Sequence, residues 1–183
     1  MAQPSIAVLA GGCFWCTEAV FKRLRGVLSV LPGYAASQIA NPSYKQVCTG
    51  NTGAAEAIQI TYDPAIISYE KLLEVFWHVH DPTTLNRQGN DYGTQYRSAI
   101  YYQNDEEKQT ALASKKALEE SGSYRNPVVT EIAPFTNFYP AENYHEDYYD
   151  TNRSAPYCMA VIDPKVKKLL KAYGGDVKAE YQK

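Results

Sequence analysis

The sequence lacks an excess of charge of either sign. Its 18 Lys and Arg residues face 20 Asp and Glu residues, which leaves a net charge of −2. This balance argues against electrostatic binding to nucleic acid or to a membrane surface. A long hydrophobic run is also missing, because the apolar stretch 6–10 is too short for a signal peptide or a membrane span. We therefore expect a cytoplasmic protein with no nucleic-acid or membrane partner, in which thiols stay reduced.

The patterns of common cofactor sites are missing as well. A zinc site would need a second pair of cysteines or histidines at ligand spacing. Cys48 and Cys158 are isolated, and His78 and His80 point to different faces of one predicted helix. No glycine-rich fingerprint for a nicotinamide or flavin cofactor is present. We expect neither a metal nor an organic cofactor.

What the sequence does contain suits one globular domain spanning residues 1–183, since 45% of its residues are hydrophobic. Short apolar runs predict strands at 6–10, 27–31, 57–62, 98–102 and 128–132. Helical periodicity predicts helices at 15–25, 68–80, 104–121 and 163–173. Ser68, Asn104 and Asp163 are the expected N-caps, and Pro32-Gly33 is expected to close the second strand. The stretch 39–53 is predicted to be a loop.

The order of these elements predicts an α+β fold. We expect a two-layer sandwich with a ferredoxin-like β-α-β-β-α-β core, long loops and an extended C-terminal segment, 134–183, which carries Cys158. Within it, 134–158 loses regular periodicity and is rich in tyrosine, and a short helix is expected around 143–150. So long an irregular stretch in a compact domain is usually functional.

The most specific local signal is the sequence GGCFWC at 11–16. Two glycines end a strand, so Cys13 is expected in the turn that opens a helix. There the free N–H groups and the helix dipole favour the thiolate, which lowers the pKa of a cysteine below its usual ~8.5 and makes it nucleophilic. Three alternatives are small core residues, a zinc site and a thioredoxin-like exchange site, the last crowded by the bulky Phe14 and Trp15. Cys48 is interpreted as a buried structural residue beside Val47.

Five motifs occur in order along the chain. They are GCFWC at 12–16, NPSYKQVC at 41–48, TGAAE at 52–56, GNDYGTQYRS at 89–98 and FYPAENYH at 138–145. Together they resemble the A-type peptide methionine sulfoxide reductases, and the resemblance extends from about residue 6 to residue 171. It implies an enzyme that reduces the S epimer of methionine sulfoxide, free or in proteins, with thioredoxin as the electron donor and no cofactor. We expect a monomer.

The resemblance also implies roles for the matching residues. Cys13 would be the nucleophile that attacks the sulfoxide sulfur, and Phe14 and Trp15 would hold the methyl group of the substrate. Glu56 would protonate the departing oxygen, which requires a carboxyl group whose pKa is raised by its surroundings. The reaction would leave a sulfenic acid on Cys13, which a second thiol converts to a disulfide.

Four further residues and the resolving thiol follow from the same resemblance. Tyr44 and Tyr96 would hydrogen-bond the oxygen, and Asp91 and Tyr148 would support the site. Cys158, in the sequence Pro-Tyr-Cys, matches the recycling cysteine of the family tail and is the preferred resolving thiol. Cys16 is the rival, and a relay through both is open. A direct bridge from Cys13 to Cys16 would need the first helical turn to relax.

Three departures from the family pattern are visible. The family commonly has His-Ala-Glu where this chain has Ala54-Ala55-Glu56, and Gly-Gly where it has Ala35-Ala36. The tail has no glycine-rich run and no cysteine after Cys158. Two alternative functions stay open at this point. One is a thioredoxin-like dithiol–disulfide oxidoreductase at Cys13 and Cys16, and the other is an aromatic-lined module that binds methionine-containing peptides.

Overall fold

The computed structural model describes residues 3–182 and is built on one mixed sheet. The six strands lie in the order β7-β6-β1-β3-β2-β8. Their bounds are β1 Ser5–Gly11, β2 Val27–Ala35, β3 Ala55–Tyr62, β6 Ser98–Tyr102, β7 Glu131–Pro134 and β8 Phe138–Pro140. Only the β6–β7 pair among these is parallel. A separate two-stranded ribbon joins β4 (Arg87–Gln88) to β5 (Asp91–Tyr92).

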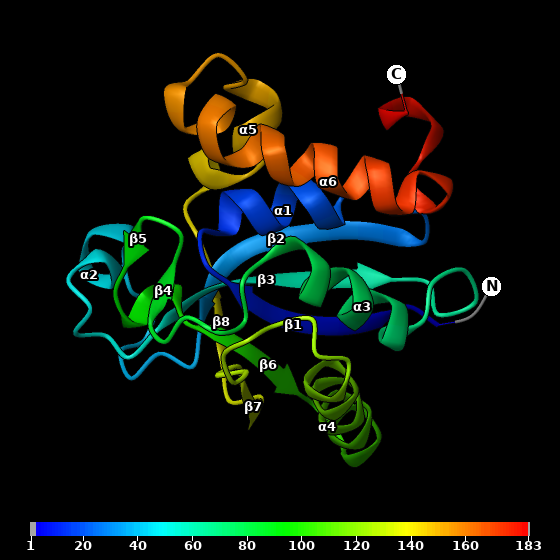
Figure 1. Ribbon diagram of the computed structural model, residues 1–183. Coiled ribbons are helices and arrows are strands. Elements are labelled where there is room, and N and C mark those ends of the chain that lie inside the picture. The colour runs from blue at the N-terminus through cyan, green and yellow to red at the C-terminus, as the bar shows by residue number, and fades with distance from the viewer. Residues whose placement is uncertain (1–2, 183) are drawn as a thin grey trace.

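Helices pack on this sheet, which gives the α+β fold expected from the sequence (Figure 1). The α-helices are α1 Phe14–Phe21, α2 Tyr44–Cys48, α3 Tyr69–Val79, α4 Asp105–Glu120, α5 Tyr148–Thr151 and α6 Asp163–Tyr173. A π-helical turn, η3 (Cys158–Ile162), runs directly into α6, and the short 3₁₀ turns are η1 Thr94–Tyr96, η2 Asn143–His145, η4 Gly174–Asp176 and η5 Ala179–Tyr181. Figure 1 shows α6 lying over α1, so helices are stacked two deep at that point. No helix within residues 3–182 has the length and apolar character to cross a membrane.

The central strand β1 explains how the sheet is covered on both faces. It pairs with β3 and with β6, and its residues from Ala7 to Gly11 are buried. Alternate residues point to opposite faces. Ala7 and Leu9 join the large core under the helices, whereas Val8 and Ala10 join a smaller cluster of mostly alanines on the other face. The apolar run read from the sequence therefore belongs to a strand buried on both sides.

Several predicted elements agree with the structure. Helix α3 begins after Ser68, whose side chain accepts a hydrogen bond from the N–H of Lys71. Helix α4 begins after Asn104, whose side chain accepts from the N–H of Glu107. A side-chain oxygen at the N-cap satisfies an amide that has no partner inside the helix. Both N-caps are confirmed.

The prediction that Pro32-Gly33 closes the second strand is wrong, because β2 continues to Ala35. The Pro32 carbonyl accepts a hydrogen bond from the N–H of Ala141 at 2.9 Å, next to β8. At Gly33 a Cβ atom would lie 2.3 Å from the Phe138 ring. Glycine is therefore needed for the close approach of β8, a three-residue strand that the sequence did not predict.

Three further boundaries differ from the predictions. The stretch 39–53, predicted as a loop, contains α2, which begins with a capping box between Ser43 and Gln46. The predicted strand 128–132 lies three residues later, as β7. Asp163 is not an N-cap, because its φ of −50° and ψ of −46° are helical and the chain arrives from η3. Much of 134–182 is helical rather than extended.

Candidate functional site

The site is built at the end of β1, where the chain turns into α1. Gly12 has a φ of 89°, and a Cβ atom at this position would lie 2.6 Å from the Gln88 side chain. This turn makes Cys13 the N-cap of α1, and its carbonyl accepts a hydrogen bond from the N–H of Cys16 at 3.1 Å. Cys13 thus lies just outside the helix and Cys16 within its first turn.

Three of the four cysteines are brought together. Cys13, Cys16 and Cys158 are 7%, 1% and 0% exposed and share one buried cluster with Ala19, Tyr149, Ile162 and Val166. All three are free thiols. Cys48 lies outside this cluster and is exposed at the end of α2, so the prediction of a buried structural cysteine is wrong. Its neighbour Val47 is the residue that this short helix buries.

The protonation of the thiol pair differs from the sequence prediction. Burial, followed by the neighbouring Cys16, raises the pKa of Cys13 well above its usual value. A hydrogen bond from Cys13 lowers the pKa of Cys16 to about 7. The prediction of a lowered pKa at Cys13 is therefore wrong for the resting protein, because desolvation outweighs the helix N-terminus. The two thiols therefore form a hydrogen-bonded pair that loses its first proton near neutral pH.

Glu56 on β3 lies beside the thiols and is 1% exposed. Its carboxylate accepts a hydrogen bond from the N–H of Phe14 at 3.1 Å, so it is held against the first residue of α1. Burial raises the pKa of Glu56 to about 8, although the Phe14 N–H opposes the shift. A carboxyl group in this state is protonated at neutral pH and can act as an acid.

Tyr44 on α2 and Tyr96 on η1 lie near Glu56 and are both half-buried. Burial, followed by the charge of Glu56, raises the pKa of each phenol, so both remain hydrogen-bond donors. Asp91, on β5, accepts a hydrogen bond from the Tyr157 hydroxyl at 2.7 Å. The same hydroxyl lies 3.8 Å from the sulfur of Cys16. Tyr157 thus links Asp91 to the thiols.

Two aromatic residues follow Cys13 and form a wall beside it. Phe14 is 1% exposed, whereas Trp15 is half-buried. The Trp15 ring stacks on Tyr148, with ring centroids 3.7 Å apart and an interplanar angle of 8°. Tyr157 meets the same indole edge-on, with centroids 5.9 Å apart. The structure therefore brings Phe14, Trp15 and Tyr148 together as a partly open apolar surface near the thiols.

Three residues of the site carried no predicted role, namely Tyr157, described above, Glu142 and His145. Glu142 accepts hydrogen bonds from the Tyr34 hydroxyl and from the N–H of Tyr44, each at 2.8 Å. His145, fully buried, accepts a hydrogen bond from the indole N–H of Trp15 at 3.0 Å. Both belong to the motif at 138–145, so the sequence alone shows that a glutamate and a histidine occur there. Their partners lie about 100 residues away in the chain, which the sequence does not show.

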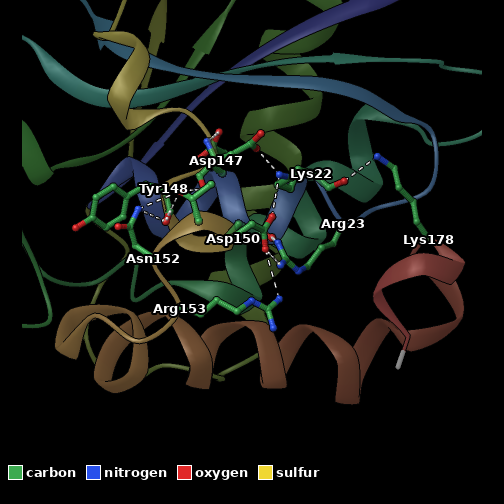
Figure 2. Close-up of polar contacts among 11 residues, drawn as sticks. Lys22, Arg23, Asp147, Tyr148, Asp150, Asn152, Arg153 and Lys178 are labelled. Carbon is green, nitrogen blue, oxygen red and sulfur yellow. Dashed lines mark hydrogen bonds and ion pairs between the residues drawn. The ribbon is translucent and has the colours of Figure 1, made fainter.

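A cluster of charges fastens the segment around α5 to α1 (Figure 2). Lys22 pairs with Asp147 and with Asp150, and the 1% exposed Arg23 pairs with Asp150. Removing one partner of a buried ion pair destabilises the fold strongly, because the other partner is left as an unpaired buried charge. Arg23 makes a further hydrogen bond to the Ala19 carbonyl at 2.6 Å. These contacts fix the position of Tyr148, which lies between the two aspartates in the sequence.

Glu18 adds a buried carboxyl group to the same attachment. It is 2% exposed and accepts a hydrogen bond from the N–H of Asp147 at 2.9 Å. Burial raises the pKa of Glu18 to about 7. Asp147 itself has a φ of 54°, a left-handed conformation that this hydrogen bond helps to hold.

The structure shows the conformation and burial of two residues at which the sequence departs from the family pattern. Ala36 has a φ of 55°, the region in which glycine is favoured, so alanine occupies a left-handed position. Its N–H donates to the Asn137 carbonyl at 3.2 Å. Ala54 is 2% exposed and joins the large core just before Glu56.

Within residues 3–182 no group of three His, Cys, Asp or Glu side chains is placed to hold a metal ion.

Comparisons with known proteins agree with one another. The family model described as "Peptide methionine sulfoxide reductase" matches residues 5–177. The peptide methionine sulfoxide reductase MsrA of Sulfolobus acidocaldarius is 55% identical over 168 residues, which cover 92% of this chain and 94% of that protein. The crystal structure of Mxr1 from Saccharomyces cerevisiae in reduced form is 35% identical, with a TM-score of 0.78, and the match covers 85% of this chain and 90% of Mxr1. The structure of Mxr1 in complex with Trx2 matches with a TM-score of 0.56 and 25% identity, over 80% of this chain and 85% of that one.

Proposed function

The chain belongs to the peptide methionine sulfoxide reductases of the A type, so it reduces methionine sulfoxide to methionine with thiols, and we propose that Cys13 is the nucleophile. One observation carries this assignment. Cys13 lies in one buried site with a second thiol, Cys16, that can take its proton and with a carboxyl group, Glu56, that can give one. The attacking sulfur must lose a proton and the transferred oxygen must gain one, so both partners are needed.

The first step uses these three residues. The Cys13 sulfur attacks the sulfoxide sulfur as its proton passes to the Cys16 thiolate. The sulfur–oxygen bond of the substrate breaks, the oxygen moves to Cys13, and the Glu56 carboxyl group protonates it. The products are methionine, a sulfenic acid on Cys13, a neutral Cys16 thiol and an ionised Glu56. The raised pKa of Glu56, about 8, keeps its proton available at neutral pH.

The remaining residues bind the substrate in this proposal. Tyr44 and Tyr96 donate hydrogen bonds to the oxygen, because both phenols stay protonated beside Glu56. Asp91 acts through Tyr157, which it holds against the thiols. Phe14, Trp15 and Tyr148 receive the methyl group. A methyl pocket on one side and oxygen donors on the other accept one sulfoxide epimer, which we assign as the S epimer.

The resolving step involves both remaining cysteines of the cluster. Cys16 contacts Cys13, whereas burial and then the charge of Cys16 raise the pKa of Cys158. This arrangement supports a relay. The Cys16 thiol attacks the Cys13 sulfenic acid and releases water, and Cys158 then attacks Cys16 to form a Cys16–Cys158 bridge and free Cys13. Cys158, the preferred resolving thiol on sequence grounds, is then the second partner rather than the first.

An external dithiol must complete the cycle by reducing this bridge. Thiol–disulfide exchange requires direct attack on sulfur. Cys158 is 0% exposed, so the segment that carries it has to move before a reductant can reach it. Mxr1, which this chain resembles, forms a complex with Trx2, and we take thioredoxin as the electron donor. Such a donor acts where thiols are kept reduced, and we propose the cytoplasm as the location of the cycle.

Two structural assignments complete the proposal. Strands β6, β1, β3 and β2 lie side by side in that order, and each adjacent pair is antiparallel. This order supports a ferredoxin-like core. We also propose that the protein acts as a monomer and forms one domain.

The test is reduction of a racemic methionine sulfoxide peptide with dithiothreitol. We expect loss of the S epimer and retention of the R epimer, and no turnover in Cys13→Ser. Turnover retained in Cys13→Ser would overturn the nucleophile, and disulfide exchange without sulfoxide reduction would favour a thioredoxin-like oxidoreductase. Mass-spectrometric mapping of bridges in Cys16→Ser and Cys158→Ser after one turnover tests the relay. A direct Cys13–Cys158 bridge at the full rate in Cys16→Ser would contradict it.

A further inference from the structure

The side chain of His145 lies fully buried between the aromatic walls of the site. Its ring centroid is 4.9 Å from that of Phe14, 4.7 Å from that of Tyr44 and 4.0 Å from that of Tyr144. None of these three contacts uses a ring nitrogen. The histidine could therefore be replaced by any flat ring if packing were its sole task.

The hydrogen bond from Trp15 gives His145 a specific chemical state. An indole N–H is a donor only, and it points at Nδ1 of His145 from 3.0 Å. Nδ1 must then carry a lone pair, so the ring proton of the neutral histidine resides on Nε2. The opposite tautomer would place two N–H groups against each other. A doubly protonated ring would do the same.

Glu142 lies on the other side of the ring and favours this tautomer. Its Oε2 atom is 3.6 Å from Nε2, and Nε2 is buried with no hydrogen-bond partner among residues 3–182. Burial works against ionisation of Glu142, but the N–H of Tyr44 and the hydroxyl of Tyr34 lower its pKa, so the carboxylate is negative. A negative charge at this distance attracts a proton to Nε2 rather than to Nδ1. The pKa of His145 itself is lowered by burial, so the ring stays neutral.

The consequence falls on Trp15. Its ring face is stacked on Tyr148, which restrains tilting, whereas the hydrogen bond to His145 restrains sliding and rotation within the plane of the ring. Two restraints of different direction define the position of an aromatic ring better than stacking alone. Tyr148 is in turn held by the charge cluster on α1.

We propose that His145 is a positioning residue which, as the Nε2–H tautomer selected by Glu142, holds the Trp15 indole in the orientation that receives the substrate methyl group. This rests on the proposed function, in which Trp15 forms the methyl pocket. His145 does not touch the reacting atoms, and it acts through Trp15. Its removal should raise KM for the sulfoxide more than it lowers kcat.

The matched variants are His145→Asn and His145→Leu. An asparagine oxygen occupies the place of Nδ1 and can accept from the indole, whereas leucine fills similar space with no acceptor. We expect His145→Leu to lower kcat/KM by about tenfold, mainly through KM, as for one lost buried hydrogen bond, and His145→Asn to recover most of this loss. In a Trp15→Phe background the same two variants should differ by less than about twofold, since the donor is gone.

A spectroscopic measurement on the Trp15 indole distinguishes loss of its hydrogen bond from a change in packing, and it does not depend on enzyme activity. The chain has two tryptophans, and the second, Trp77, donates its indole N–H to the Ser114 hydroxyl at 2.6 Å, far from His145 in the sequence. In ¹H–¹⁵N spectra, His145→Leu should shift the Trp15 indole resonance and speed its exchange with water, while the Trp77 resonance stays in place. His145→Asn should return the Trp15 resonance toward its original position.

The wild-type protein provides a further test if His145→Leu does not fold. The ¹⁵N shifts of the His145 ring should show a bare Nδ1 and a protonated Nε2. The reverse tautomer, an unmoved Trp15 resonance in a folded His145→Leu, or equal losses in the leucine and asparagine variants would each overturn the proposal. If Cys13→Ser retained turnover while these spectra behaved as described, the catalytic assignment would fail and the hydrogen bond to Trp15 would stand.

Discussion

The two halves of the segment that covers α1 are attached to the molecule in different ways. The anchored half, residues 143–153, is held to α1 by the ion pairs of Lys22 and Arg23 and by the carboxylate of Glu18. The thiol half, residues 154–162, has its polar side-chain contacts with the rest of the described chain through Tyr157 alone, and η3 within it is a π-helical turn. Apolar burial supplies the rest of its attachment.

This difference matches what each half must do in the proposed cycle. The anchored half carries His145 and Tyr148, which shape the substrate pocket and must keep their positions. The thiol half carries Cys158, which has to leave its buried place so that a reductant can reach it. Wide helical turns with few polar contacts are among the less stable parts of a fold. The attachment thus separates a fixed pocket from a movable thiol within 20 residues.

The largest expected effect comes from breaking the anchored half. Asp150→Ala leaves the buried Arg23 guanidinium without its carboxylate, and we expect it to lower the free energy of unfolding by about 3 kcal/mol. Urea unfolding measures this loss. Met159→Ala is the matched change in the thiol half, on a 53% exposed side chain, and should stay within about 0.5 kcal/mol. Equal losses in the two variants would remove the distinction between the halves.

The next effect concerns the thiol half directly. In Cys158→Ser the bridge stops at Cys13 and Cys16, both buried, so steady-state turnover with thioredoxin should fall about tenfold or more. With no more than one equivalent of substrate per enzyme and no reductant, the yield of methionine should be unchanged. Cys48→Ser, which alters the exposed cysteine outside the cluster, is the control and should leave both quantities unchanged. A lower single-turnover yield in Cys158→Ser would show that Cys158 takes part before the relay.

Each half contains a tyrosine whose hydroxyl donates to an aspartate, so the same substitution can be made in both halves. The Tyr149 hydroxyl donates to Asp163 at 2.6 Å, and the Tyr157 hydroxyl to Asp91 at 2.7 Å. Tyr149→Phe should lower the free energy of unfolding by about 1 kcal/mol and leave the single-turnover rate unchanged. Tyr157→Phe should slow single turnover about fivefold, the same energy expressed in the rate. Stopped-flow kinetics and urea unfolding measure both quantities in both variants. A slower single turnover in Tyr149→Phe, or an unchanged one in Tyr157→Phe, would contradict the prediction.

Glu18, which holds the anchored half to α1, gives stability a pH dependence. The pKa of Glu18 is raised to about 7 in the folded protein, well above the usual value of 4.5. The native state therefore binds more protons than the unfolded state between these values, so stability falls as the pH rises from about 4.5 to 7. Glu18→Gln keeps an acceptor for the Asp147 N–H and removes the charge, and we expect its stability to stay level over this range, so that it exceeds that of the wild type at pH 8. At pH 4.5 the two proteins should have equal stability, and a difference that did not change with pH would contradict the assignment.

The rate should have its own pH dependence, set by Glu56. Its pKa of about 8 makes the acid available below pH 8, so the single-turnover rate should decline above that value.

Local signals were sufficient for part of the fold and site. Ser68 and Asn104 identified the starts of α3 and α4 because a capping side chain acts on amides two or three residues away. The two glycines at 11–12 likewise predicted that Cys13 lies in the turn that opens a helix, and it is the residue before α1. The capping box of Ser43 and Gln46 could have revealed α2 within its Asn- and Gly-containing stretch. Each of these depends on residues that are close in the sequence.

Long-range contacts account for what was not predicted. The pKa of Cys13 is raised because distant residues such as Ile162 bury it, which the helix N-terminus alone does not reveal. The role of His145 depends on Trp15, 130 residues earlier. Gly33 was read as a strand end, although its absent side chain makes room for Phe138. The resemblance to a family supplied residue types for the site but not these contacts.

Hydrogen exchange in the reduced protein and in the protein oxidised by one substrate equivalent tests the central claim most directly. We expect amides 156–162 to lose protection on oxidation while amides 143–153 keep theirs. Loss of protection in both halves together, or in neither, would contradict a fixed pocket with a separately movable thiol.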